Sequence, residues 1–181
     1  MKRISLTLVF AVTLLVAAPA VYAQQAEMMR NRTREQMRTL LERVGPRPDV
    51  NVAFRLSDKQ PYNFVGMMRE GLANCDSLEI VISITSKDTI GFRVYPHYRG
   101  AYINVDKARN GTGLMRKLLQ LSDEAFLFWG IDSSSDVFAG YTFTLESGFP
   151  EEAVTIVLRS IRNTDKFVGD MRPNIDGTNP Q

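Results

Sequence analysis

Side chains that commonly carry out catalysis are scarce in this chain. It has one cysteine and one histidine, Cys75 and His97, and the proline next to His97 predicts a turn at that point. A single Cys cannot form an intramolecular disulfide or a cysteine-based zinc site, and a single His rules out a His-Glu zinc motif. The serines at 133–135 lie in a predicted turn, and the sequence has no Gly-x-Ser-x-Gly elbow to activate one of them. We therefore expect a protein that is not an enzyme and that uses no metal and no cofactor.

Two polar motifs could hold an ion. Gly111-Thr112-Gly113 precedes a predicted helix, whose N-terminus could bind an anion. The motif lacks the Lys-Ser/Thr pair of a P-loop and the third glycine of a dinucleotide site, which favours a flexible helix entrance. Asp132 and Asp136 could ligate calcium loosely, but the glycine and distal glutamate of an EF-hand loop are missing, which favours a solvated turn.

Aromatic side chains are concentrated in two adjacent predicted strands. They are Phe126, Phe128, Trp129, Phe138, Tyr141 and Phe143. Because side chains alternate along a strand, these rings lie on both faces, and only one face can pack on the helices. Large apolar groups on the other face usually mark a contact with a protein or peptide. We assign Trp129, Tyr141 and Phe143 to a partner-binding face, and Phe126 and Phe128 to the core. The alternative is that the last helix or the N-terminal helix covers this second face.

Hydrophobic periodicity predicts the elements that position these residues. Helical spacing predicts helices over 33–44, 58–72, 114–121 and 151–168. Alternation predicts strands over 78–84, 90–95, 101–105, 125–131 and 137–145, with a short strand or linker over 51–56. The short turns between strands indicate antiparallel pairing. We expect an α+β fold with an antiparallel sheet of about five strands, in the order α-β-β-β-α-β-β-α. The helices should pack on one face, and an N-terminal Arg-rich helix should precede the domain.

The N-terminal residues have the pattern of an export signal. Lys2 and Arg3 precede an apolar stretch over 4–18, and Val21-Tyr22-Ala23 places small residues before a cleavage point. Cleavage after Ala23 would make the protein periplasmic or secreted, without stable membrane insertion. The alternative is an uncleaved anchor. The signal carries two of the 22 basic residues, so the remainder would match the 20 acidic ones. This balance argues against a nucleic-acid partner, which requires a surplus of basic charge.

Residues 24–50 form an Arg-rich helical lead-in and linker. Thr33 and Gln36 have the spacing of a capping box, which predicts that a helix begins there and ends at Gly45. Its arginines could contact an acidic partner or phospholipid head groups, although a solvated face is the simpler interpretation. Outside this segment, Cys75 lies between a predicted helix and a predicted apolar strand, and we expect a buried structural thiol rather than an intermolecular linker.

The stretch from Ala101 to Phe167 resembles the YbjN family. The similarity lies in Ile103-Asn104, then Asn110 and a Leu-rich helix, the aromatic strand 126–129, the turn between Asp132 and Asp136, and the segment from Leu145 to Glu152. This resemblance implies the type III secretion chaperone-like fold over residues 51–171, followed by a flexible tail at 172–181. It implies no catalytic residue.

The resemblance also implies a function. We expect an exported binding or chaperone-like module that contacts a protein or peptide, forms a homodimer, and has a sensory or stress-related role. The alternative is a small-ligand sensor that uses a cavity between the sheet and the helices.

Overall fold

A seven-stranded antiparallel sheet forms the centre of the computed structural model, which describes residues 5–124 and 127–179, with side chains from Gln24 onwards. The strand order is β1-β2-β3-β4-β7-β6, and β5 pairs with β4 beyond the end of β7. The strands are β1 (Phe54–Leu56), β2 (Asn63–Met68), β3 (Ser77–Ile84), β4 (Thr89–Tyr98), β5 (Ala101–Tyr102), β6 (Phe128–Ile131) and β7 (Val137–Thr144).

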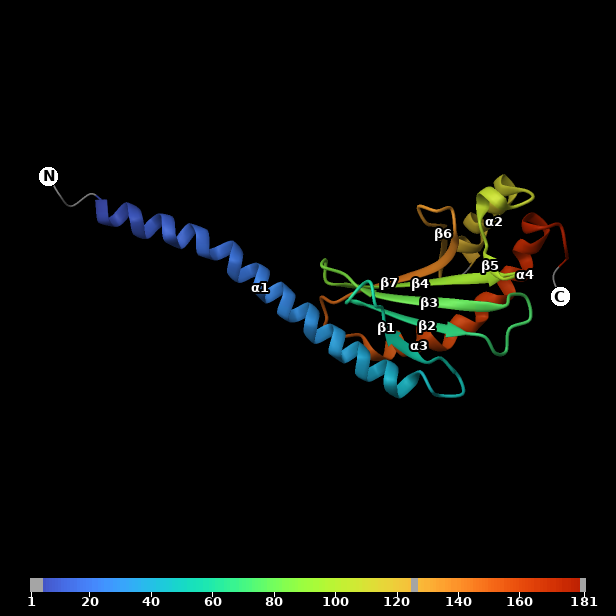
Figure 1. Cartoon of the computed structure of the whole chain (residues 1–181), viewed down its shortest axis with the longest axis horizontal. Coiled ribbons are helices and arrows are strands. Elements are labelled where there is room, and N and C mark those ends of the chain that lie inside the picture. The colour runs from blue at the N-terminus through green and yellow to red at the C-terminus, as the bar shows by residue number, and fades with distance from the viewer. Residues whose placement is uncertain (1–4, 125–126, 180–181) are drawn as a thin grey trace.

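Helices pack against one face of this sheet. They are α1 (Ser5–Val44), α2 (Gly111–Glu124), α3 (Glu151–Ser160) and α4 (Thr164–Ile175), with short 3-10 turns at Val105–Lys107 and Ile161–Asn163. In Figure 1, α3 and α4 lie behind the strands, whereas the first half of α1 extends away from the sheet. The α+β fold with an antiparallel sheet and helices on one face is therefore confirmed.

The core lies between the sheet and the helices. On β3 and β4, alternate residues are fully buried on the helix side: Leu78, Ile80, Ile82, Ile84, Ile90, Phe92 and Val94. The helices contribute apolar stripes to the same core, among them Leu114, Leu118, Val154, Leu158 and Val168. Burying each such side chain stabilises the fold by about 1.5–3 kcal/mol. The intervening strand residues, such as Val81 and Arg93, lie on the opposite face.

The helix predicted over 58–72 is wrong, because this segment contains strand β2. Phe64 and Met68 are four residues apart, which fits one helical turn and also two periods of a strand. In the structure Phe64 and Met68 point toward the core, and Val65 between them lies on the opposite face. Strand β2 pairs with β3 and with β1, so the sheet has seven strands rather than about five.

Helix α1 begins well before the predicted capping box. The hydroxyl of Thr33 donates to the carbonyl of Met29, four residues earlier, as it does within a helix. The predicted end is confirmed, since α1 ends at Val44. Its last turns are part of the core, because Met37 and Leu40 are at most 1 % exposed.

The C-terminal segment differs from the expectation in two ways. The helix predicted over 151–168 is interrupted after Ser160, and α4 then continues to Ile175. The tail was predicted to be flexible over 172–181, but its described part, residues 172–179, is bound to the domain. Asp176 accepts hydrogen bonds from the hydroxyl of Tyr98 at 2.8 Å and pairs with Arg99 at 2.8 Å.

Candidate functional site: the uncovered face of the sheet

The exposed ring on β6 is Phe128, not Trp129. Phe128 is 46 % exposed, whereas Trp129 is 5 % exposed. The Trp129 ring lies 6.0 Å from the ring of Phe167 on α4, and its backbone N–H donates to the hydroxyl of Ser122 on α2. The expectation that Trp129 faces outward and Phe128 inward is therefore wrong. Phe126, which was also assigned to the core, lies outside the described residues.

Tyr141 and Phe143 also lie on the helix side of the sheet. They alternate with Thr142 and Thr144, which are exposed. Phe143 is 9 % exposed, and its ring lies 5.9 Å from that of Phe92 in the core. All three residues assigned to partner binding therefore lie on the face that the helices cover.

The face that no described helix covers carries a different aromatic cluster. Tyr95 on β4 is its centre, with the ring of Phe138 at 5.7 Å and the ring of Tyr102 at 5.8 Å. Phe128 meets Phe138 at 6.0 Å, edge to face, and the ring of His97 lies 4.3 Å from that of Tyr102 in a tilted contact. Such edge-to-face contacts stabilise rings beyond their buried area. We call these five residues the outer aromatic cluster.

The sequence allows one residue of the outer aromatic cluster to be placed on the correct face of its strand. Tyr95 occupies the face of its strand opposite to the apolar residues Phe92 and Val94. The pairing of Tyr95 with Phe138 was not visible, because it depends on the long-range contact between β4 and β7.

One carboxylate organises the polar edge of this cluster. Glu79 accepts a hydrogen bond from the hydroxyl of Tyr102 at 2.6 Å, and its carboxylate lies 3.3 Å from Nε2 of His97. The hydrogen bond to Glu79, with burial, raises the pKa of the Tyr102 phenol. Tyr102 therefore stays protonated and acts as a donor that fixes Glu79 in place.

Arg93 lies beside the same rings. Its guanidinium is 4.5 Å from the centre of the Phe138 ring, a cation–π contact, and Nη1 donates to the hydroxyl of Tyr95 at 3.3 Å. The side chain is exposed. The uncovered face thus combines rings, a fixed carboxylate and a cation.

The other candidate residues have structural roles. The N–H of Gly113 donates to the side chain of Asn110 at 2.9 Å, so part of the proposed anion site is already capped. Asp132 accepts the N–H groups of Ser134 and Asp136, as expected for a turn. Among the described residues, no three His, Cys, Asp or Glu side chains lie close enough together to hold a metal ion.

Cys75 is buried, as expected, and takes part in a contact between two elements. The carboxylate of Asp165 on α4 accepts the backbone N–H groups of Ala73, Asn74 and Cys75 at 2.9–3.0 Å. Burial, followed by the contact with Asp165, raises the pKa of the thiol. Such a thiol is unreactive at neutral pH, and the cluster fastens the β2–β3 loop to α4.

Several arginines of the lead-in are bound within the protein. Arg30 donates to the carbonyl of Ile84 at 2.7 Å and lies 3.6 Å from the centre of the Tyr62 ring. Arg43 pairs with Glu151 at the start of α3. These contacts attach α1 to the domain, and they leave fewer arginines for an acidic partner or for lipid head groups.

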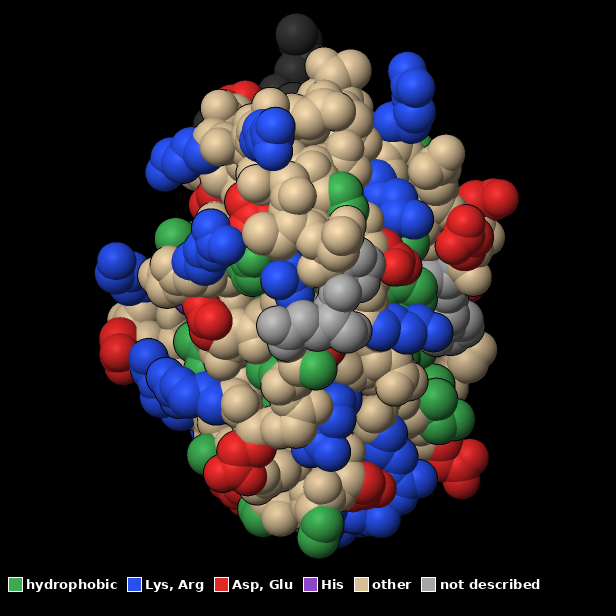
Figure 2. Space-filling model, turned by 90° about the vertical axis from the view of Figure 1, so that its right-hand side faces the viewer, with side chains coloured by type: hydrophobic (Ala, Val, Ile, Leu, Met, Phe, Trp, Pro, Cys, Tyr) green, Lys and Arg blue, Asp and Glu red, His purple; other side chains and the backbone are tan. Residues whose placement is uncertain are grey.

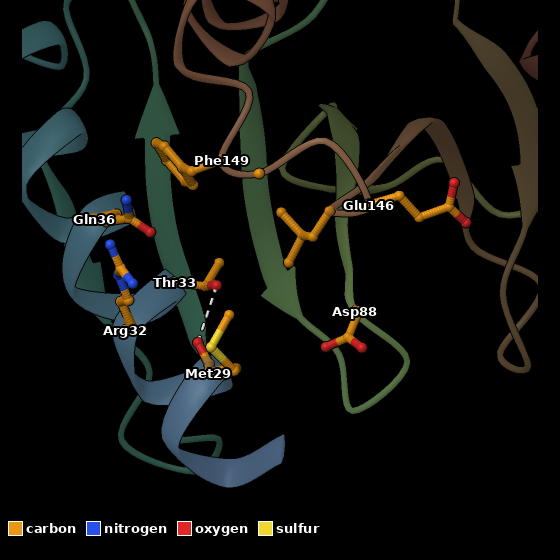
Figure 3. Close-up of a pocket in the computed structure, with 9 residues that line it drawn as sticks. Met29, Arg32, Thr33, Gln36, Asp88, Glu146 and Phe149 are labelled. Carbon is orange, nitrogen blue, oxygen red and sulfur yellow. Dashed lines mark hydrogen bonds between the residues drawn. The ribbon is translucent and has the colours of Figure 1, made fainter. Parts of the chain in front are cut away.

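A groove of about 350 Å³ lies between α1 and the loop that follows β7. Figure 3 shows Met29, Arg32 and Gln36 of α1 on one side, with Phe149 and Glu146 on the other. The small-ligand alternative places its site between the sheet and the helices. Core side chains occupy the space between the sheet and the helices, so the groove is not located where this alternative expects a ligand cavity.

The surface in Figure 2 carries charges of both signs. Lys and Arg side chains alternate there with Asp and Glu over the end of the molecule that faces the viewer. No large field of one sign is visible on this side. Within the residues whose side chains are described, no helix combines the length and apolar composition needed to cross a membrane.

No protein-family model matches the chain, and no curated protein is significantly similar to it in sequence. The resemblance to the YbjN family therefore stays a prediction.

Proposed function

We propose that this chain is a non-enzymatic binding module that docks a protein or peptide partner against the uncovered face of its sheet. The observation that supports this proposal is the outer aromatic cluster. Phe128 and Tyr102 are 46 % and 40 % exposed on a face that no described helix covers. Exposed tyrosine and phenylalanine near arginine are typical of interface centres.

The rigidity of the cluster supports the same function. The ring contacts around Tyr95 and the hydrogen bonds to Glu79 hold these side chains in place before any partner arrives. A preorganised surface loses little side-chain entropy on binding, which leaves more of the contact energy for affinity. A chaperone-like role, which the YbjN resemblance implies, requires such a surface.

Site-specific photo-crosslinking tests the proposal. A photoreactive amino acid replaces Phe128, and a matched control carries it at Ile156 on α3, which is 60 % exposed. We expect a discrete crosslinked adduct from position 128 and none from position 156. The partner protein in the adduct, once identified and purified, should bind the wild-type chain and should bind the F128A variant more weakly. Adducts at both positions, or no loss with F128A, would contradict the proposal.

The same experiment addresses the homodimer. An adduct with twice the mass of the chain would identify a second copy as the partner. Light scattering at micromolar concentration should then give a dimer for the wild type and a monomer for F128A.

The N-terminal pattern supports export as part of this proposal. Signal cleavage after Ala23 predicts that the mature chain begins at Gln24. Intact mass measurement of the protein from a periplasmic or culture fraction checks this start. A mass that includes the first 23 residues would instead favour the anchor.

A further inference from the structure

The uncovered face carries a positive charge that no described carboxylate neutralises. Arg93 contacts the Phe138 ring and the Tyr95 hydroxyl, and within the described residues it forms no ion pair. Its position is central, because β4 lies between β3 and β7 in the sheet. A guanidinium held in this way keeps most of its donors available, since it has five N–H groups.

Two other charged side chains of this face make contacts of their own. Glu79 is bound by Tyr102 and lies against His97, and Arg55 on β1 pairs with Asp58 at 3.1 Å. Glu79 keeps its negative charge, because the phenol that binds it is neutral, and Arg93 remains a cation without an ion pair within the described residues.

Apolar groups flank Arg93 across the neighbouring strands. Val81 on β3 and Gly140 on β7 are its register partners. The ring of Phe128 covers Gly140, because a Cβ at that position would lie 2.4 Å from the ring. An anion bound at Arg93 would thus have an aliphatic group on one side and an aromatic ring on the other.

A shallow strip of small residues leads to the same guanidinium. Gly91 lies two residues before Arg93 on the same face, and its register partners are Ser83 and Thr142. A Cβ built at Gly91 would meet no atom within 4 Å, so the space above it is open. A partner segment therefore has room to approach the backbone at Gly91, two residues from Arg93.

We propose that the partner of this face presents a carboxylate between apolar side chains, and that Arg93 binds the carboxylate while the exposed ring of Phe128 packs on the apolar groups. This inference rests on the proposed docking function of the face. The guanidinium fork matches a carboxylate in two parallel hydrogen bonds, and charge-assisted bonds are roughly twice as strong as neutral ones. A basic group placed at Arg93 would meet like charge and is disfavoured.

The binding of three synthetic peptides to the full chain tests this chemistry. The protein is purified in the form that the expressing cells produce. The first is a short fluorescent peptide with one aspartate between leucine and phenylalanine residues. Its twins carry asparagine or lysine in place of that aspartate. Variants R93A, R93K and F128A are compared with R116A, a matched control whose arginine is exposed on α2.

We expect the aspartate peptide to bind the wild type roughly tenfold more tightly than the asparagine twin, and the lysine twin to bind most weakly. R93A should remove the difference between the first two peptides, R93K should retain part of it, and R116A should leave it unchanged. Thermal melting checks that each variant is folded.

Two other results separate the inference from the proposed function. If F128A weakens all three peptides but the wild type binds them equally, the carboxylate inference is overturned and the docking face stands. If no peptide binds at millimolar concentration, or if F128A changes none of them, both are overturned.

Discussion

Neighbouring residues on a strand point to opposite faces, so the rings of Phe128 and Trp129 cannot have the same role. W129A removes a large buried side chain whose ring packs against Phe167 on α4, and we expect it to lower the free energy of unfolding by about 3–5 kcal/mol. F128A removes an exposed ring and should cost less than about 1 kcal/mol. Urea denaturation measures both values. Losses of equal size would mean that both faces of β6 are covered.

A second residue makes the stability depend on pH. Burial acts to raise the pKa of Asp165, but hydrogen bonds from the N–H groups of Ala73 and Asn74 outweigh it, and the pKa lies below the ordinary value. A carboxylate with a lowered pKa stabilises the fold above the aspartate range, and this stabilisation is lost as the pH falls through the folded-state pKa.

D165N should therefore destabilise the protein at neutral pH and matter less in acid. The variant loses charge-assisted hydrogen bonds, each of which contributes about 1.5–3 kcal/mol. Urea unfolding of both proteins from neutral pH down to acid provides the measurement. A difference that stays constant over this range would show that the charge of Asp165 contributes nothing.

At the scale of elements, Gly66 distinguishes the observed strand from the predicted helix. In a helix, G66A would stabilise the protein by about 1 kcal/mol, because alanine favours helices more than glycine does. In strand β2, a Cβ at this position would lie 2.5 Å from Val52 and 2.7 Å from Phe54. We expect G66A to destabilise by about 1–3 kcal/mol. The sign of the change in melting temperature decides between the two structures.

The elements also show what the sequence could predict. Strands β3 and β4 have long apolar–polar alternation that fits only a strand, and both were predicted correctly. Strand β2 is short and has the four-residue spacing that both periods share. The faces of β6 and β7 were assigned wrongly, because aromatic residues occupy both sides of the hairpin. Only the position of the helices decides which side is core, and that depends on tertiary contacts that periodicity does not encode.

At the scale of the whole molecule, α1 and the sheet share one core. Leu40 of α1 and Ile82 of β3 are 1 % and 0 % exposed and belong to the same apolar cluster. A lead-in that was merely attached to the domain would tolerate changes at Leu40 without effect on the sheet. A shared core instead makes the two elements unfold together, as small single domains usually do.

L40A and I82A should therefore have similar consequences. Each leaves a cavity in a region with little room to collapse, and we expect each to lower the free energy of unfolding by about 2–5 kcal/mol. The fluorescence of Trp129 on β6 and far-ultraviolet circular dichroism should report a single, coincident transition in both variants. L119A on α2 serves as the control, because Leu119 is 72 % exposed and should change stability by less than about 0.5 kcal/mol. If L40A lowered only the helical signal and left the Trp129 transition in place, α1 would be an independent appendage rather than part of the fold that holds the outer aromatic cluster.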